Sequence, residues 1–236
     1  MGDYANAAEF YDLLYCGEKD YEAEARLLAD LIRSSDPEAK SVLDVGCGTG
    51  THARHLLDQG FEVDGVDLEP AFVEIASEKC PEGRYRVGDM RTLDLPERYD
   101  AVLCLFSAIG YVVHEEALME TLKSLARHVK PGGVLMVDPW FEPGELTDGW
   151  ITTLVAQGEE ATASRMSRTV IEATVSRLEF EYLIGTAKGI ERRSEVHELG
   201  LFTGHQMEAA FAAAGLSVER KSKVLRTRGL YVGRVV

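Results

Sequence analysis

Residues 41–50 constrain the fold of this chain more than any other segment. They read Ser-Val-Leu-Asp-Val-Gly-Cys-Gly-Thr-Gly, a short apolar strand followed at once by three alternating glycines. Glycines let the backbone turn sharply and let a bound molecule lie close to the peptide plane. An ordinary tight turn between a strand and a helix would also explain the triplet. The segment therefore predicts a strand–turn–helix unit and makes the turn a candidate ligand site.

Acidic residues at the ends of the predicted strands strengthen the case for a ligand. Asp44 lies directly before the glycines, where a dinucleotide fingerprint would usually have an apolar residue. A second apolar strand, 61–66, ends at Asp67, where a carboxylate can accept hydrogen bonds from two ribose hydroxyls. A third predicted strand, 84–88, is followed by Asp89.

This combination resembles the class I S-adenosylmethionine-dependent methyltransferases, and a nicotinamide-dependent dehydrogenase is the alternative. Carboxylates suit an α-ammonium, a sulfonium and a ribose diol better than bare amides do. The resemblance implies S-adenosyl-L-methionine as the cofactor, with Asp89 on the adenine amino group. The cofactor-binding residues that we expect are Tyr15, Asp44, Gly46, Cys47, Gly48, Thr49, Gly50, Asp67, Leu68, Asp89, Met90 and Phe106.

Length and composition suit an ordered globular protein. The chain has 236 residues, of which 45% are hydrophobic, enough to bury a sizeable core. It has no apolar run as long as a membrane span, and its first residues do not read as a signal peptide. The 4 cysteines are scattered without a Cys-x-x-Cys pair, so we expect neither disulfides nor a metal site. We predict a cytoplasmic protein with no membrane partner.

The charge is unevenly distributed along the chain. The formal net charge is −15, yet residues 151–236 hold 12 Lys and Arg against 10 Glu and no Asp, which leaves 13 against 30 for residues 1–150. A field this negative disfavours non-specific binding of nucleic acid, which we do not expect as a partner. The mildly cationic remainder is compatible with a small anionic substrate, and equally with chance.

Strand and helix patterns alternate over the first part of the chain. Such alternation, with nearly continuous apolar strands, predicts a parallel sheet with helices on both faces. The Lys-Pro-Gly-Gly turn at 130–133 is expected to act as a sharp stop before the fifth strand. The expected strands are 41–45, 61–66, 84–88, 100–106 and 133–138, and the expected helices are 21–32, 51–59, 70–79 and 115–128.

The pattern changes after Pro143. Polar and apolar residues alternate over 151–203, which predicts an antiparallel meander rather than another strand–helix–strand unit. A helix near 205–214 and a hairpin of strands 217–225 and 229–235 complete the elements. The predicted fold is α/β. Residues 1–150 and 204–236 form a Rossmann-like seven-stranded methyltransferase sheet, and the antiparallel β insertion 151–203 contributes to substrate binding or dimerisation.

In an open α/β sheet, ligands bind beyond the carboxyl ends of the strands. The loop 105–111 after the fourth strand lacks the Pro-Pro-aromatic motif expected of an enzyme that methylates a DNA base. The loop after the fifth strand carries Trp140 and Phe141, which we expect either to form a wall for a substrate ring or to plug the edge of the core.

Further segments extend the resemblance over nearly the whole chain. They are 10–15 (Phe-Tyr-Asp-Leu-Leu-Tyr), 19–21, 43–52, 88–91 (Gly-Asp-Met-Arg), 106–111, 139–141, 148–150 and 228–233. In these the chain resembles the N,N-dimethyltransferases of nucleotide-linked amino sugars, which make the dimethylamino sugars of macrolide antibiotics. The resemblance implies a homodimer that methylates, twice in succession, the amine of a dTDP-linked deoxyamino sugar.

The same resemblance assigns roles to individual residues. It implies that Tyr15 reaches the methionyl end of the cofactor, and that Tyr111 and Ser107 lie near the sugar amine. His114 on the same loop is a candidate proton acceptor or an ordinary surface residue, and Arg228 is a diphosphate contact or part of a solvated hairpin. The expected catalytic residues are therefore Tyr111, His114 and Ser107, and the expected substrate-binding residues are Tyr11, Tyr21, Trp140, Arg165, Arg168 and Arg228.

Two other functions remain open at this point. A methyltransferase for another small amine or carboxylate metabolite would also use Arg228. A regulatory or scaffold module that binds the cofactor without turnover would keep the glycine loop, although the intact acids Asp44, Asp67 and Asp89 argue against it.

Overall fold

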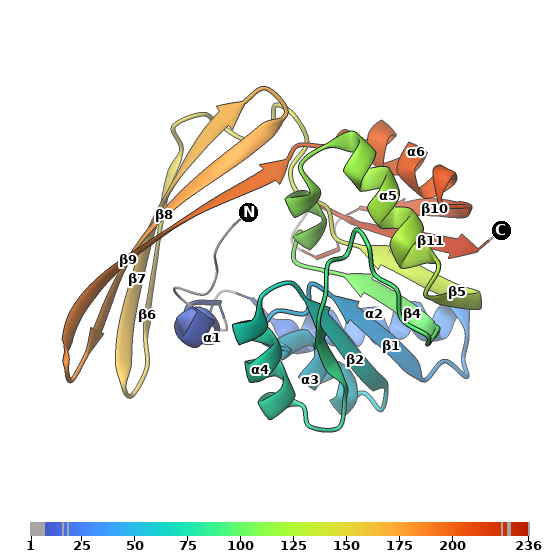
Figure 1. Ribbon diagram of the computed structural model, residues 1–236, viewed down its shortest axis with the longest axis horizontal. Coiled ribbons are helices and arrows are strands. Elements are labelled where there is room, and N and C mark those ends of the chain that lie inside the picture. Colours follow the sequence, from blue (N-terminus) through green and yellow to red (C-terminus); the bar gives the residue numbers. More distant parts are fainter. Residues whose placement is uncertain (1–7, 16, 18, 223, 226–227, 236) are drawn as a thin grey trace.

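The computed structural model describes residues 8–15, 17, 19–222, 224–225 and 228–235, which form two sheets (Figure 1). The larger sheet has 7 strands in the order β10-β11-β5-β4-β1-β2-β3. Neighbours from β5 to β3 pair in parallel, whereas β11 pairs antiparallel with both β5 and β10. This is the predicted parallel sheet closed by a reversed strand. The strands are β1 (Ser41–Val45), β2 (Glu62–Asp67), β3 (Tyr85–Val87), β4 (Tyr99–Cys104), β5 (Val129–Val137), β10 (Leu216–Lys221) and β11 (Leu230–Val235).

Helices cover both faces of the larger sheet. On one face Leu28 and Leu56 pack with Leu103 of the sheet, and on the other Leu122 and Phe211 belong to a second buried cluster. Both packed faces follow from the helical spacing of apolar residues. None of the helices within the described ranges is long and apolar enough to cross a membrane. The helices are α2 (Tyr21–Ser35) and α3 (Thr51–Asp58) on the first face, α5 (Glu115–Ala126) and α6 (Gly204–Ala213) on the second, and α4 (Pro70–Lys79) beside β2 and β3.

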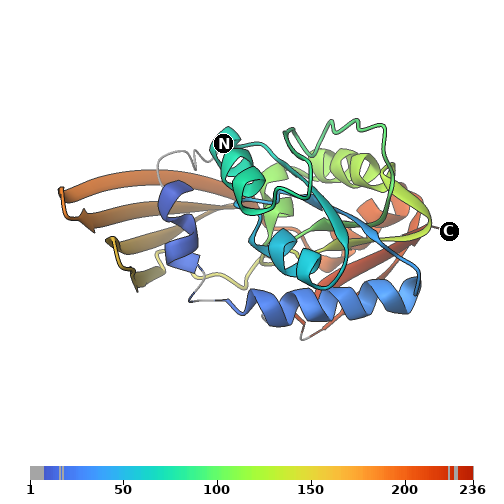
Figure 2. The ribbon, with the colours of Figure 1, turned by 90° about the horizontal axis from the view of Figure 1, so that it is seen from below.

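The smaller sheet is an antiparallel meander of four consecutive strands, as the alternation over 151–203 predicts. One face is buried against the short helix α1 (Tyr11–Tyr15), where Leu14 packs with Phe180 and Ile184. Figure 2 shows α1 standing between the two sheets. The strands are β6 (Ile151–Gln157), β7 (Ala161–Glu172), β8 (Val175–Thr186) and β9 (Gly189–Gly200).

The prediction that residues 130–133 form a sharp stop before the fifth strand is wrong. β5 begins at Val129 and runs through this segment, and the pairing with β4 shifts register there. Val129 pairs with Tyr99, and the next pair joins Val134 to Ala101. The Pro-Gly-Gly residues bulge out of the strand, with Gly132 at φ +82°, because proline cannot donate to the ladder and glycine tolerates left-handed backbone. The turn residues therefore interrupt the strand instead of ending it.

Candidate active site

The glycine loop after β1 adopts the conformation that the sequence predicts. Gly46, Gly48 and Gly50 have φ values of +74°, +53° and +75°, a left-handed backbone that strains other residues. A Cβ on Gly46 would lie 2.7 Å from the Cβ of Ala108, in the helical turn η3 (Ala108–Val112) that follows β4. The glycine loop and η3 are therefore packed too closely for any side chain at position 46.

Asp44 is the most unusual group at this end of the sheet. Its side chain is buried, and neither carboxylate oxygen has a hydrogen-bond partner among the described residues. Burial, with a further contribution from the Asp67 charge, raises the pKa of Asp44 to about 7, and Lys19 acts in the opposite direction. A buried, unpaired carboxylate is costly unless a cation joins it. The site therefore fits a ligand that brings positive charge to the end of β1.

Asp67 ties the glycine loop to the end of β2. Its carboxylate accepts hydrogen bonds from the backbone N–H groups of Gly48 (2.8 Å) and Glu69 (2.9 Å). Burial still raises its pKa. The neighbouring Leu68 exposes 45% of its surface, an apolar side chain left in the open beside a carboxylate. An acid next to an apolar contact suits a ribose and its attached base.

Asp89 follows β3 and lines a cavity of about 300 Å³ with Val66, Gly88 and Leu93. Its carboxylate is held by Arg91, at 2.5 Å, and this contact keeps the pKa of Asp89 below its usual range. A contact from Asp89 to an adenine amino group would therefore share the carboxylate with Arg91. Two more residues predicted to bind the cofactor lie in the core beside these strands. Met90 is partly buried and Cys47 is buried.

The N-terminal helix α1 is tied down over the glycine loop. Asp12 accepts hydrogen bonds from the Thr49 hydroxyl (2.5 Å) and from Lys79 (2.5 Å). The ring of Tyr15 lies 5.5 Å from that of Phe106, in the loop after β4. Tyr15 and Phe106, both expected cofactor contacts, thus pack together, whereas the Thr49 hydroxyl donates to Asp12. Tyr11 packs between Tyr15 and Phe72 of α4.

A buried cluster at the start of α2 holds a cation beside the site. Lys19 pairs with Glu24 (2.8 Å), and its ammonium lies 4.3 Å from the centre of the Phe106 ring. Glu24 also bonds His52 (3.0 Å), and burial lowers the pKa of His52 to about 4, so this imidazole is neutral. Tyr21, a predicted substrate contact, packs on His52 and is itself buried. Lys19 is the member of the cluster that faces Phe106.

The loop after β5 brings a second buried acid and a cation together. Asp138 Oδ1 has no hydrogen-bond partner among the described residues, and burial raises the pKa of Asp138 to about 6 against the opposing charges of Arg228 and Lys19. The Arg228 guanidinium lies 5.2 Å from the Trp140 ring and 5.0 Å from the Phe141 ring. The aromatic pair therefore supports Arg228, a contact that neither of the two expected roles included.

The three predicted catalytic residues on or beside the loop after β4 have different surroundings. Ser107 has φ +62° and its hydroxyl donates to the Pro139 carbonyl oxygen (2.8 Å), so it joins the loops after β4 and β5. The Tyr111 hydroxyl lies 3.2 Å from His197 Nδ1 of β9. His114 is exposed at the start of α5, and the structure does not bring it to the buried groups of the site.

Two arginines of β7 in the insertion were predicted to bind substrate, and the structure brings one of them to the site. Arg165 donates a hydrogen bond to the Tyr15 hydroxyl, and its guanidinium lies 4.6 Å from the Phe180 ring. Arg168 is three positions further along the same strand, so it emerges on the opposite face, where it pairs with Glu179 at 3.1 Å. The structure does not bring Arg168 to the site.

Sequence reasoning missed several groups that the structure places here. Lys19, Asp138 and the buried pair Glu195 and His197 were not among the predicted site residues. Asp138 had a signal, because an acid that directly follows β5 lies at the same edge of the sheet as Asp67 at the end of β2. Glu195 and His197 had none, since alternating polar residues are ordinary in an antiparallel strand.

Comparisons with known proteins agree with this geometry. Residues 42–133 match the family described as a methyltransferase domain. The chain is 40% identical to the dTDP-3-amino-3,4,6-trideoxy-alpha-D-glucopyranose N,N-dimethyltransferase of Streptomyces venezuelae, over 96% of both sequences. It is 36% identical to the dTDP-4-amino-2,3,4,6-tetradeoxy-D-glucose N,N-dimethyltransferase of Saccharopolyspora spinosa, over 96% of this chain and 91% of that sequence.

Solved structures resemble the chain over nearly its whole length. The crystal structure of DesVI from Streptomyces venezuelae matches with a TM-score of 0.92 at 39% identity and covers 99% of each chain. CalS10 from Micromonospora echinaspora, an amino pentose methyltransferase solved with S-adenosylmethionine bound, matches with a TM-score of 0.86 at 37% identity over 96% of each chain. Both the larger sheet and the insertion therefore have counterparts in solved methyltransferases.

Proposed function

Because the chain belongs to the family of the dTDP-amino-sugar N,N-dimethyltransferases, and is therefore an S-adenosylmethionine-dependent methyltransferase, we propose that it adds two methyl groups in succession to the amine of a nucleotide-linked deoxyamino sugar. One observation of the site carries the proposal: the buried Asp44 carboxylate at the end of β1 has no hydrogen-bond partner among the described residues, and Arg228 lies on an aromatic wall near Asp138 after β5. The first suits the cofactor, and the second suits a diphosphate.

S-Adenosylmethionine, when bound, supplies a methyl group on a sulfonium, which an amine displaces directly. Asp44 would hold the positive methionyl end, since its buried charge has no partner among the described residues. Asp67 and Leu68 would hold the ribose and the base. The three glycines allow the close approach that these contacts need.

The protein's remaining tasks are orientation and exclusion of water. In-line placement of a nucleophile contributes up to about 7–11 kcal/mol in well-oriented systems, so a methyl transfer needs few reactive side chains. Arg228, fixed by Trp140 and Phe141, would anchor the diphosphate at one end of the substrate. Tyr111, half-buried in η3, would face the sugar amine.

We also propose that two copies of the chain pair through the outer face of the smaller sheet. Its inner face is covered by α1, whereas apolar side chains on the outer face stay exposed, among them Val155 (69%) and Leu183 (54%). An exposed apolar patch of this kind marks an interaction surface. The Cys47, Cys80 and Cys104 thiols are free, which suits work in the reducing cytoplasm.

The experiment is a screen of acceptors with purified protein and S-adenosylmethionine, read by mass spectrometry. The panel contains thymidine-diphosphate sugars with an amine at the third or the fourth carbon, since relatives of both kinds are known. Matched sugars with a hydroxyl in place of the amine serve as controls. The proposal expects one and then two added methyl groups on an amino sugar alone. Methylation of a free amino acid or a carboxylate instead would favour the other small-metabolite function.

A further inference from the structure

Three buried polar side chains on the inner face of the smaller sheet form a hydrogen-bonded series with the half-buried Tyr111 of η3. The Tyr111 hydroxyl lies 3.2 Å from His197 Nδ1, and His197 Nε2 lies 3.2 Å from Glu195 Oε2. The Tyr182 hydroxyl donates to the same Glu195 oxygen over 2.8 Å. The side chains of His197 and Glu195 are fully buried. An imidazole and a carboxylate enclosed together are costly to keep in a core, so the pair is an unusual feature for a purely structural sheet.

The chemistry of these groups fixes the direction of each hydrogen bond. A carboxylate only accepts, so His197 Nε2 carries the proton that it shares with Glu195. In the neutral imidazole Nδ1 is then the acceptor, and the Tyr111 hydroxyl donates to it. Burial raises the pKa of Tyr182, which therefore keeps its proton and donates to Glu195. Every donor in the series points toward Glu195, and the Tyr111 oxygen retains lone pairs for a further donor.

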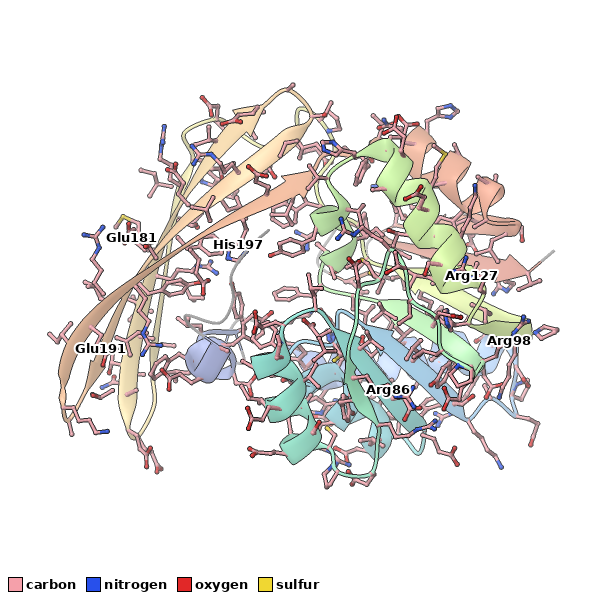
Figure 3. The ribbon with its side chains drawn as sticks, viewed as in Figure 1. Arg86, Arg98, Arg127, Glu181, Glu191 and His197 are labelled. Carbon is pink, nitrogen blue, oxygen red and sulfur yellow. The ribbon has the colours of Figure 1, made fainter. Side chains whose placement is uncertain are left out.

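The series continues toward the cofactor end of the site. Alternation along β9 directs Glu195 and His197 to the side that faces the larger sheet, where His197 is labelled in Figure 3. The Phe180 ring lies 4.9 Å from His197, and Arg165 lies over both Phe180 and Tyr15. Tyr15 in turn packs on Phe106. Side chains in contact thus lead from His197 to the loop beside Asp44.

We propose that Glu195 and His197 are positioning residues that make Tyr111 the proton acceptor for the substrate ammonium. This inference rests on the proposed function. An N–H bond of the ammonium breaks as an O–H bond forms at Tyr111, while the original Tyr111 O–H bond breaks and an N–H bond forms at His197 Nδ1. The substrate is left as a neutral amine with its lone pair free. The new imidazolium is paired with the Glu195 carboxylate.

Two methylations need two such transfers. An alkyl amine is mostly protonated at neutral pH, and after the first methylation the nitrogen is again a cation that must lose a proton before it can react. Each proton held by His197 returns through the half-buried Tyr111 to water before the next transfer. With a proton acceptor nearby, the methylated amine can lose its proton in the site, and the second methylation can follow without release of the amine to bulk solvent.

Charged and titratable side chains surround the pair on several elements. Among the described residues they are Arg193 of β9, which is in register with Tyr182 of β8, together with Tyr182 itself, Arg165 of β7, Tyr15 of α1 and Tyr111 of η3. The pH dependence of the proposal comes from the substrate, because an amine that arrives as an ammonium must lose a proton before it can react.

The test compares pH–rate profiles of variants on the amino sugar that the unaltered protein methylates. Tyr111→Phe, His197→Asn and Glu195→Gln each interrupt the series. Ser167→Ala is the matched control, because Ser167 is buried on the same face and bonds Thr152 (2.5 Å) instead. We expect Tyr111→Phe and His197→Asn to lower kcat about 100-fold near neutral pH, with KM changed less than about threefold, and Ser167→Ala to follow the unaltered protein.

High pH separates a proton-transfer role from a structural one. Above the pKa of the amine the substrate arrives neutral, so the variants should approach the unaltered rate there. Full kcat in the variants near neutral pH would overturn the proposal, and so would a loss that high pH does not restore. If the unaltered protein methylates no amino sugar, the proposed function fails first and this inference fails with it.

A second measurement is independent of turnover and of how well the buried variants fold. Nitrogen NMR of histidine-labelled protein reports which ring nitrogen carries the proton. We expect the His197 signal to show a protonated Nε2 and a bare Nδ1, and Tyr111→Phe to shift the Nδ1 resonance. A proton on Nδ1 in the neutral ring would contradict the series of donors and overturn the proposal.

Discussion

Asp44 should destabilise the cofactor-free protein in a pH-dependent way, and Asp44→Asn should remove that effect. Burial raises the pKa of Asp44 from 3.8 to about 7 in the fold. The folded state therefore binds more protons than the unfolded chain across this interval, so stability falls as pH rises through it. Roughly three pKa units at about 1.36 kcal/mol each correspond to about 4 kcal/mol once Asp44 is fully ionised.

The assay is urea unfolding of the unaltered protein and Asp44→Asn without cofactor. The interval from about pH 5 to pH 8 includes about two of the three pKa units over which the folded and unfolded states bind protons differently. The stability advantage of Asp44→Asn should therefore grow by about 3 kcal/mol over this interval. The change with pH, rather than the value at one pH, isolates the carboxylate from any difference in amide packing. S-Adenosylhomocysteine should then raise the urea concentration at which half of the unaltered protein is unfolded, and leave that concentration unchanged for the variant. A stability difference that stays flat between these pH values would refute the reasoning.

Three further predictions address the loop, the substrate and the assembly. Gly46→Ala should lower stability by more than about 2 kcal/mol and weaken cofactor binding, whereas Gly144→Ala, with a left-handed φ of +89° but no close neighbour, should cost only about 1–2 kcal/mol in thermal unfolding. Arg228→Ala should raise KM for the nucleotide sugar about tenfold or more with a smaller change in kcat, and Arg234→Ala in the same hairpin should match the unaltered enzyme; equal KM values would remove Arg228 from the diphosphate site. Leu183→Glu should halve the mass measured by light scattering, and an unchanged mass would show that the outer face is not the interface.

The larger sheet was predictable because its signals are local. Each strand is a short apolar run, and the glycines at 46, 48 and 50 occupy left-handed positions that few other residues tolerate. The carboxyl ends of parallel strands meet at one edge, so Asp44 and Asp67 could be placed together before the structure was known. The bulge at 130–133 was misread because Pro-Gly-Gly breaks a ladder in the same way whether the strand ends or continues.

The substrate side depends on contacts between distant segments. His197 meets Tyr111 across 86 positions of sequence, and nothing near Tyr111 in the chain indicates that partner. The histidine chosen from the sequence, His114, lies on the right loop yet is exposed. Side chains alternate between the two faces of a strand, so Arg165 and Arg168 lie on opposite faces of β7. Which of the two faces the site could not be predicted, because both faces of β7 carry polar residues.

The most direct test of the central claim is the position of the transferred carbon in the product. The enzyme is supplied with S-adenosylmethionine labelled with carbon-13 at the methyl group and with the preferred thymidine-diphosphate amino sugar, and the product is examined by NMR. The account predicts two equivalent labelled methyl groups on one sugar nitrogen. Label on a sugar oxygen, on the nucleotide or on no part of the amino sugar would contradict it.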